Sequence, residues 1–335
     1  MPLKEIQLPQ DLMGIAELAI ESFQYPDNPS WNIREDEAAE TVDTITRLKQ
    51  LWPLIRPLTV ISPALQDILR GFFWVDEQGK VLGSAITRRI GSSQTWEIGN
   101  VAVLPAHRRR GIGRKLVQAS LDLIRARGGR LAWLEVVKDN QPAYELYLKL
   151  GFKPYSGDVI FEREPPFPDE PAGLPAGVSA EPLPRSKWQL RYALDLRIVP
   201  QEVKVYEPVE PDQFRHPLAM YLLGPIIAYA QGVQTRSTLL REIRSPTPFA
   251  IYGTRIPTRG TGLIMLRSRV DPERPELARP VVRSILSDLA RSGVELRAEW
   301  ILPNWMPAVI EAASDMGFQL EYETIRMGQI LEPAR

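Results

Sequence analysis

The residues best suited to chemistry lie in one short segment that joins an apolar stretch to a helical one. The segment reads Arg-Arg-Arg-Gly-Ile-Gly at residues 108–113, and it follows the apolar run of residues 101–104. The first NH groups of a helix have no partner within the helix and lie at the positive end of its dipole. Glycines let a phosphate approach these NH groups closely, and the arginines add charge. This order predicts a pyrophosphate site in preference to a solvated arginine run at a helix start.

Three further side chains could move protons. Glu97 and Glu135 each lie in a strand-like segment of mostly apolar residues, where a carboxylate is costly to bury without a partner. Either glutamate could instead face solvent at the end of its strand. Tyr147 lies on the apolar face of a short helix that Asn140 is expected to cap. A tyrosine in such a place is usually a core residue, so the tyrosine alone does not indicate a function.

Taken together, these motifs resemble those of the GNAT acetyltransferases. The Arg-x-x-Gly-x-Gly motif after a Val-x-Pro strand end resembles the coenzyme A pyrophosphate loop of that family. The later Asn-x-x-Ala-x-x-x-Tyr-x-x-x-Gly-Phe at residues 140–152 follows in the family's order and spacing. The resemblance covers residues 3–164 well and the remainder only in outline. It implies acetyl-CoA as cosubstrate, no metal, and a binding site that consists of Val101, Ala102, Val103, Arg108, Arg109, Arg110, Gly111, Ile112, Gly113, Arg114, Asn140 and Tyr147.

The resemblance also implies a reaction, which is direct transfer of an acetyl group to a primary amine on a small molecule or a peptide. The backbone of residues 101–103 would pair with the pantetheine arm, and its NH groups would stabilise the oxyanion. Tyr147 occupies the family's place for the acid that protonates the leaving thiolate. Glu97 resembles the base of the histone-acetylating branch, and Glu135 resembles the base of the branch that acetylates ribosomal protein N-termini. We favour Glu97 and keep Glu135 as the alternative.

Two other functions remain open at this stage. The chain could bind or sense an acyl-CoA or an amine without turnover, although the two glutamates and Tyr147 together argue against this. It could also transfer a longer acyl group, because the sequence does not fix the chain length at the thioester. An acidic run at residues 35–43 would attract a cationic amine, or it is simply the solvated face of an amphipathic helix.

The resemblance implies the α/β class, with two GNAT-like domains that each have a splayed mixed β-sheet flanked by helices. The hydrophobic periodicity places the elements. Strands are expected near residues 3–8, 72–75, 81–87, 96–104 and 131–137, and helices near 11–23, 33–52, 111–127 and 140–150. A proline-rich stretch, residues 165–177, predicts an extended linker between a domain at 1–164 and a domain at 178–335. The second half repeats the outline of the first, which indicates a duplicated domain.

The second half lacks the chemistry of the loop. An ungapped alignment places Glu276, Ala278 and Pro280 where the first half has an arginine and two glycines. These residues reverse a charge, block close approach and remove an NH donor. Glu299 and Asn304 keep the places of the strand glutamate and the capping asparagine. We therefore expect a degenerate domain without a cofactor site, which closes the acceptor pocket, provides a dimer face or binds a different ligand.

Composition narrows the partners. Lys+Arg and Asp+Glu are equal at 41 each, so a nucleic-acid partner is not expected. The chain has no cysteine and only the histidines His107 and His216, which argues against disulfides and metal clusters. Its opening residues do not resemble a secretory signal, and its most apolar window, residues 218–230, is shorter than the ~20 residues of a membrane span. We expect a cytoplasmic protein without a membrane partner.

Overall fold

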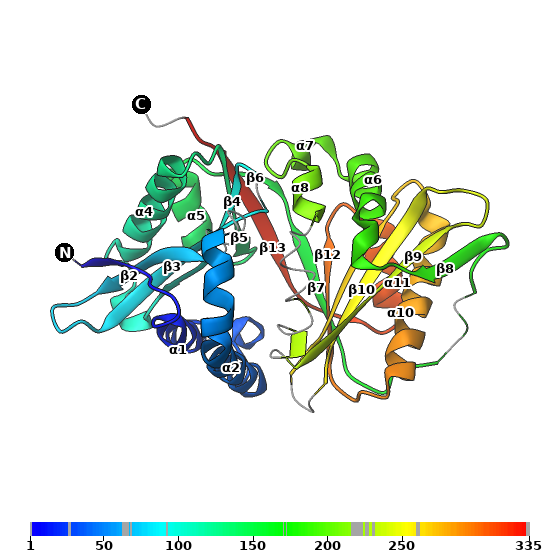
Figure 1. Ribbon diagram of the computed structural model, residues 1–335, viewed down its shortest axis with the longest axis horizontal. Coiled ribbons are helices and arrows are strands. Elements are labelled where there is room, and N and C mark those ends of the chain that lie inside the picture. Colours follow the sequence, from blue (N-terminus) through cyan, green and yellow to red (C-terminus); the bar gives the residue numbers. More distant parts are fainter. Residues whose placement is uncertain are drawn as a thin grey trace.

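The chain forms one continuous mixed sheet that runs across two halves, with helices on both faces (Figure 1). The computed structural model describes residues 2–332 except 26–27, 62–66, 68, 92, 170, 172, 216–223, 225–227, 230–231 and 259–261. The strand order is β1-β2-β3-β4-β5-β13-β7-β12-β11-β10-β9-β8, with β6 beside β13. The predicted mixed α/β class with two similar halves is thus confirmed.

The first half carries the elements that position the loop. Trp96 and Leu134 of the sheet pack against a buried stripe on α4 that includes Val117, Leu121 and Ile124. Helix α1 packs on the opposite face. The elements are β1 (Leu3–Glu5), α1 (Leu12–Ser22), a 3-10 turn (Pro29–Trp31), α2 (Glu35–Ile61), β2 (Arg70–Val75), β3 (Val81–Arg89), β4 (Thr95–Val103), a 3-10 turn (Pro105–His107), α4 (Ile112–Ala126), β5 (Leu131–Val137), α5 (Gln141–Lys149), β6 (Lys153–Ser156) and β7 (Asp158–Arg163).

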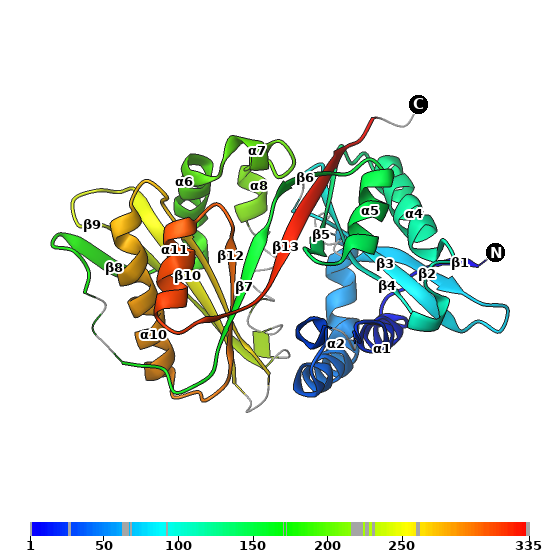
Figure 2. The same cartoon turned by 180° about the vertical axis from the view of Figure 1, so that it is seen from behind.

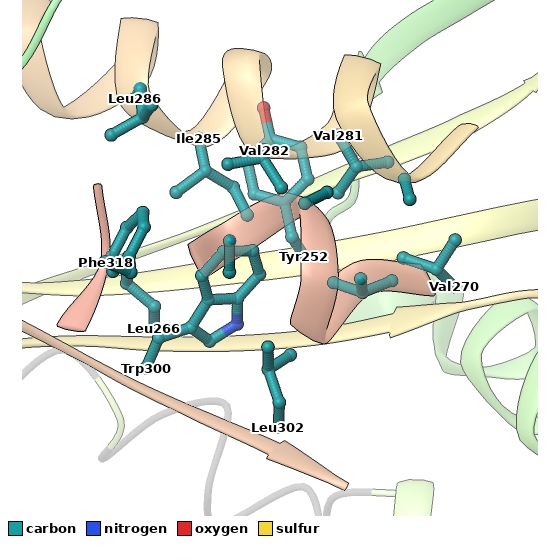
Figure 3. Packing of buried hydrophobic residues seen from close by; sticks show 14 of the residues in the cluster. Tyr252, Leu266, Val270, Val281, Val282, Ile285, Leu286, Trp300, Leu302 and Phe318 are labelled. Carbon is teal, nitrogen blue, oxygen red and sulfur yellow. The ribbon is translucent and has the colours of Figure 1, made fainter. Parts of the chain in front are cut away.

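The second half has its own core between its strands and α10 with α11. Figure 3 shows Trp300 and Leu266 of this sheet below Val281 and Ile285 of α10. The elements are β8 (Val178–Pro182), a 3-10 turn (Arg185–Lys187), α6 (Trp188–Ile198), α7 (Gln201–Lys204), α8 (Pro211–Phe214), β9 (Val233–Glu242), β10 (Pro248–Pro257), β11 (Ile264–Val270), a 3-10 turn (Pro275–Leu277), α10 (Ala278–Ser292), β12 (Ala298–Pro303), α11 (Pro307–Asp315) and β13 (Gln319–Ile330).

The two halves exchange their last strands. Residues 324–330 of β13 pair with residues 131–137 of β5, whereas β7 of the first half pairs with β12 of the second. Strand β13 therefore ends beside α4 and α5, as Figure 2 shows. Where the strands cross, a Cβ on Gly157 would lie 2.2 Å from the carbonyl oxygen of Thr324, so this position requires glycine. The ranges 1–164 and 178–335 stay a prediction, and strand exchange is a feature that they did not include.

Ser186 lies inside a 3-10 turn, and α6 begins after Lys187 without a side-chain cap. The apolar window 218–230 and His216 lie largely outside the described residues. Among the helices that are described, none is both long and apolar enough to cross a bilayer.

Candidate functional site

The central feature of the first half is a gap between two parallel strands. β4 and β5 pair only over residues 95–98 and 131–134, and they separate beyond Ile98. On its other edge β4 still pairs with β3, and the NH of Leu104 donates to the carbonyl of Leu82. Since NH groups alternate between the two edges of a strand, those of Val101 and Val103 face the gap. The splayed sheet expected from the sequence is therefore present, with two NH groups at its open edge.

A pocket of about 640 Å³ occupies this gap. Every residue of the predicted cofactor set lines it apart from Arg110. The pocket also has an apolar wall from α1, the turn after it and α5, which the sequence analysis did not identify. The added residues include Phe23, Tyr25, Trp31, Pro142, Ala143 and Leu146.

The loop before α4 has the backbone that an anion site needs. Arg109 has φ 63° and Gly111 has φ 77°, both left-handed, and α4 begins directly after at Ile112. A Cβ on Gly111 would meet no atom within 4 Å, so the glycine is required by its φ and leaves open space. A Cβ on Gly113 would make only ordinary contact with Leu146 at 3.5 Å, so the protein's own packing does not require this glycine. The unpartnered NH groups of the first helical turn lie in the pocket wall.

Arg108 has a structural task in this loop. Its Nε donates to the carbonyl of Val103 at 3.2 Å, and its Nη2 donates to the carbonyl of Ser22 at 2.6 Å. Its guanidinium also lies 4.9 Å from the centre of the Tyr25 ring. Arg108 thus ties the loop to the ends of β4 and α1. The charges that remain at the pocket wall for a ligand come from Arg109 and Arg114.

Asn140 and Tyr147 bring α5 to the same pocket. The side-chain oxygen of Asn140 accepts from the NH of Ala143 at 3.3 Å, so the predicted N-cap is confirmed. Tyr147 is buried, and its ring packs edge-on against Phe152 with centroids 6.2 Å apart. Within the described parts of the chain, no residue bonds to the Tyr147 hydroxyl. Burial raises the pKa of Tyr147 above its ordinary value, so the phenol keeps its proton.

The two glutamates flank the point where the strands separate, but neither lines the pocket. The neighbouring strand residues face the α4 core, so alternation places both glutamates on the opposite sheet face. Glu97 forms an ion pair with Arg88. Glu135 accepts a hydrogen bond from the Thr324 hydroxyl and lies opposite Arg326 of β13. The exchanged strand therefore supplies the neighbours of Glu135.

The surroundings of Glu135 favour its protonated form. Burial is the main cause that raises its pKa, and the negative charge of Asp158 adds to this. Arg326 and the Thr324 hydroxyl act in the opposite direction, and the net pKa shift is upward. A carboxylate with a raised pKa accepts a proton more readily than an ordinary one.

The acidic run at the start of α2 does not stand free. Glu37 forms an ion pair with Arg297, which directly precedes β12, and the same guanidinium pairs with Glu162 of β7. The side chains of Asp36 and Glu40 lie outside the described residues. The charge of Glu37 is therefore used to join the two halves.

At the matching place in the second half, the space is about 30 Å³, which is roughly the volume of one water. Met306 is buried there, and its sulfur accepts from the NH of Val270 at 3.5 Å. Glu276 is held by Arg274 beside the helix start. Asn304 does not cap α11, since its side chain accepts from the Ser156 hydroxyl at 3.4 Å.

Comparison with known proteins shows that the first half is similar in sequence to acetyltransferases. The model of the Acetyltransferase (GNAT) family matches residues 18–152. Streptothricin acetyltransferase of Streptomyces lavendulae is 37% identical over 83 residues, which are 25% of this chain and 44% of that protein. [Ribosomal protein bS18]-alanine N-acetyltransferase of Escherichia coli (strain K12) is 38% identical over 80 residues, 24% of this chain and 53% of that protein. The chain thus spans about half the length of these relatives.

Solved structures resemble the whole chain. A tandem GNAT protein from the clavulanic acid biosynthesis pathway has a TM-score of 0.65 at 16% identity, covering 99% of this chain and 100% of that one. A GCN5-related N-acetyltransferase from Sphaerobacter thermophilus has a TM-score of 0.61 at 13% identity, covering 100% and 97%. At these identities the likeness concerns the fold, and it extends through both halves.

Proposed function

We propose, from the premise that this chain belongs to the acetyltransferase (GNAT) family, that it transfers an acetyl group from acetyl-CoA directly to a primary amine. The observation that carries the proposal is one pocket that joins the open edge of β4, the start of α4 and Tyr147. Its volume, about 640 Å³, lies within the ~300–1,000 Å³ of ordinary ligand sites. Acetyl-CoA fits the residues present, because NH donors and two arginines meet an apolar wall.

The residues of the pocket divide the work of holding the cosubstrate. The NH groups of the first turn of α4, together with Arg109 and Arg114, hold the pyrophosphate. The NH groups of Val101 and Val103 pair with the pantetheine arm as an added strand would. Asn140 keeps its amide nitrogen for the same arm while its oxygen caps α5.

Transfer then needs one bond to form and one to break. The neutral amine attacks the thioester carbonyl, the C–N bond forms, and the C–S bond breaks as the tetrahedral intermediate collapses. An NH group at the open edge of β4 stabilises the oxyanion. Tyr147 gives its proton to the leaving thiolate, which suits a buried phenol that keeps its proton.

We assign removal of the amine proton to Glu135 rather than to Glu97, which the sequence favoured. Glu97 is engaged in an ion pair with Arg88. Glu135 has a raised pKa and lies just beyond the last pair of the β4–β5 ladder, beside the gap. Proton removal leaves the amine lone pair free to attack.

For the acceptor we propose a small-molecule or peptide amine. The two relatives named above act, by their names, on streptothricin and on the alanine of ribosomal protein bS18. Thiol release from acetyl-CoA should be measured against a panel that contains small polyamines, aminoglycosides and short peptides with free N-termini. Amine-dependent release of coenzyme A, with one acetyl group gained by the amine, is the expected result.

The same assay separates the two rival functions. Tight acetyl-CoA binding without amine-dependent release across the panel would favour a binding or sensing protein. Faster release from propionyl-CoA or a longer acyl-CoA than from acetyl-CoA would favour transfer of longer acyl groups. We further propose that the protein works in the cytoplasm, where acetyl-CoA is made.

A further inference from the structure

A second pocket, of about 580 Å³, lies in the second half on the sheet face opposite α10 and α11. Tyr252 and Leu266 point from β10 and β11 into the α10 core, as Figure 3 shows. Their strand neighbours Ile251, Gly253 and Arg267 therefore face the other way and line this pocket. Helices α6 and α8 cover it, so the pocket has no part in the coenzyme A gap.

The lining is strongly positive. It contains one carboxylate, Asp195, whose Oδ1 lies 3.8 Å from Nε of Arg269. Arginines therefore outnumber carboxylates in the lining. The arginines that line the pocket are Arg185, Arg191, Arg255, Arg267 and Arg269.

Two of these arginines have no counter-ion in contact. Arg191 of α6 and Arg267 of β11 form neither a hydrogen bond nor an ion pair with any residue in the described ranges. The surrounding protein lowers the pKa of both, because desolvation disfavours the charged form. A desolvated guanidinium that has no hydrogen-bonded or ion-paired partner is stabilised by an anion that enters the pocket.

The remaining lining adds a preference for an organic ligand. Trp188 of α6 and Phe214 of α8 give the pocket aromatic walls, and both rings are fixed by contact with Tyr192. Thr235 and Ser237 of β9 add hydroxyl groups. Aromatic faces beside guanidinium forks suit a carbon frame that carries carboxylate or phosphate groups.

We propose that this pocket binds a small organic dianion, whose carboxylate or phosphate groups pair with Arg191 and Arg267 and whose carbon frame lies against Trp188 and Phe214. Arg267 also interacts electrostatically with Glu135 and Asp158 at the junction of the halves. The inference does not depend on acetyl transfer.

Citrate and inorganic pyrophosphate are suitable probes. Calorimetric titrations at fixed ionic strength, with coenzyme A in saturating amount, keep the α4 loop occupied and report on the second pocket. We expect one citrate per chain. Arg191→Gln and Arg267→Gln should each weaken citrate binding by at least about tenfold. Arg244→Gln, in the exposed turn after β9, removes the same charge and should leave citrate affinity unchanged.

Thermal melting separates a binding role from a structural one. Without ligand, the Arg191→Gln and Arg267→Gln variants should melt no lower than the unmodified chain, since each change relieves the desolvation of a buried charge and breaks no hydrogen bond or ion pair. With citrate, only the unmodified chain and Arg244→Gln should gain stability. The proposal is overturned if the probes fail to saturate the protein through the millimolar range. It is also overturned if a variant that carries both Arg191→Gln and Arg267→Gln binds citrate unchanged, or if the ligand-free variants melt lower than the unmodified chain. Thiol release by the first half is independent of each of these outcomes.

Discussion

The two halves of this molecule place the same succession of elements around very different spaces. In each, a strand ends, a 3-10 turn follows, a long helix begins, and a parallel strand leads to a short closing helix. The space between these elements is about 640 Å³ in the first half and about 30 Å³ in the second. The difference comes from a few side chains and not from a change of topology.

In the second half, side chains take the place that a ligand has in the first. Met306 fills the opening between β11 and α11, and Ala278 and Pro280 begin α10 where the first half has glycines. The apolar stripe of α10 does not depend on these residues, since Val281 and Ile285 pack on the sheet regardless. The fold therefore tolerates the loss of the site, because the residues that bind a pyrophosphate are not the residues that form the core.

The largest expected effect comes from a change in the loop before α4, the feature that distinguishes the first half. Gly111→Pro should lower coenzyme A affinity by at least about 100-fold, because proline cannot adopt the left-handed φ of 77° and lacks the NH group. Calorimetry measures the affinity. Gly128→Pro is a matched control, with φ 73° at the far end of α4 and equally open space around its Cβ. Equal affinity in the two variants would contradict the assignment of the loop.

The next effect concerns the acid. Tyr147→Phe keeps the packing against Phe152 and removes the proton donor, so coenzyme A affinity should hold while kcat falls by about 10²–10⁴-fold. Since the pKa of Tyr147 is raised, the unmodified enzyme should show no alkaline loss of rate from this group up to about pH 10. A fully active Tyr147→Phe enzyme would remove the tyrosine from the mechanism.

A smaller, pH-dependent effect distinguishes the glutamates. Glu135→Gln should slow the reaction by up to about 10²-fold near neutral pH. A base is active when deprotonated, so the rate of the unmodified enzyme should rise with pH through the raised pKa of Glu135. The deficit of Glu135→Gln should shrink at higher pH, where the amine loses its own proton. Glu97→Gln should change the rate little, and the reverse order of the two variants would restore Glu97 as the base.

The smallest effect on activity comes from the second half. Met306→Ala empties the small space beside α11 and should lower the free energy of unfolding by about 2–5 kcal/mol. Urea unfolding measures this change. Coenzyme A affinity and turnover should stay as they were, because Glu276 and Pro280 still exclude a pyrophosphate. A gain of a second coenzyme A site in this variant would show that Met306 alone closes the second half.

The part of the site that depends on local spacing could be predicted from the sequence. The loop and the cap at Asn140 follow from residues close together in the chain, whereas the gap between β4 and β5 was expected only from the family resemblance. The tasks of Arg108 could not be predicted in this way, because its partner Ser22 comes from α1. The same holds for Glu135, whose pKa is raised by burial and by Asp158 of β7 and is lowered by Arg326 and Thr324 of the exchanged strand.

The fold, too, could be predicted where a local pattern determines it and not where contacts between distant segments determine it. A helix with a clear apolar stripe, α4, was predicted within a residue of its observed bounds. The β9–β10 hairpin and the strands β6, β7 and β13 were not assigned, because their pairing is set across the junction of the halves and not by a local pattern. The second pocket could not be predicted either, because its arginines come from the turn before α6, from α6 itself, and from β10 and β11.

The stoichiometry of coenzyme A binding tests the comparison between the halves most directly. A calorimetric titration of the full chain with coenzyme A should saturate at one per chain, and Gly111→Pro should abolish that single event. Saturation at two per chain, or one site that survives Gly111→Pro, would mean that the loop of the second half binds the nucleotide and that the account of the two halves is wrong.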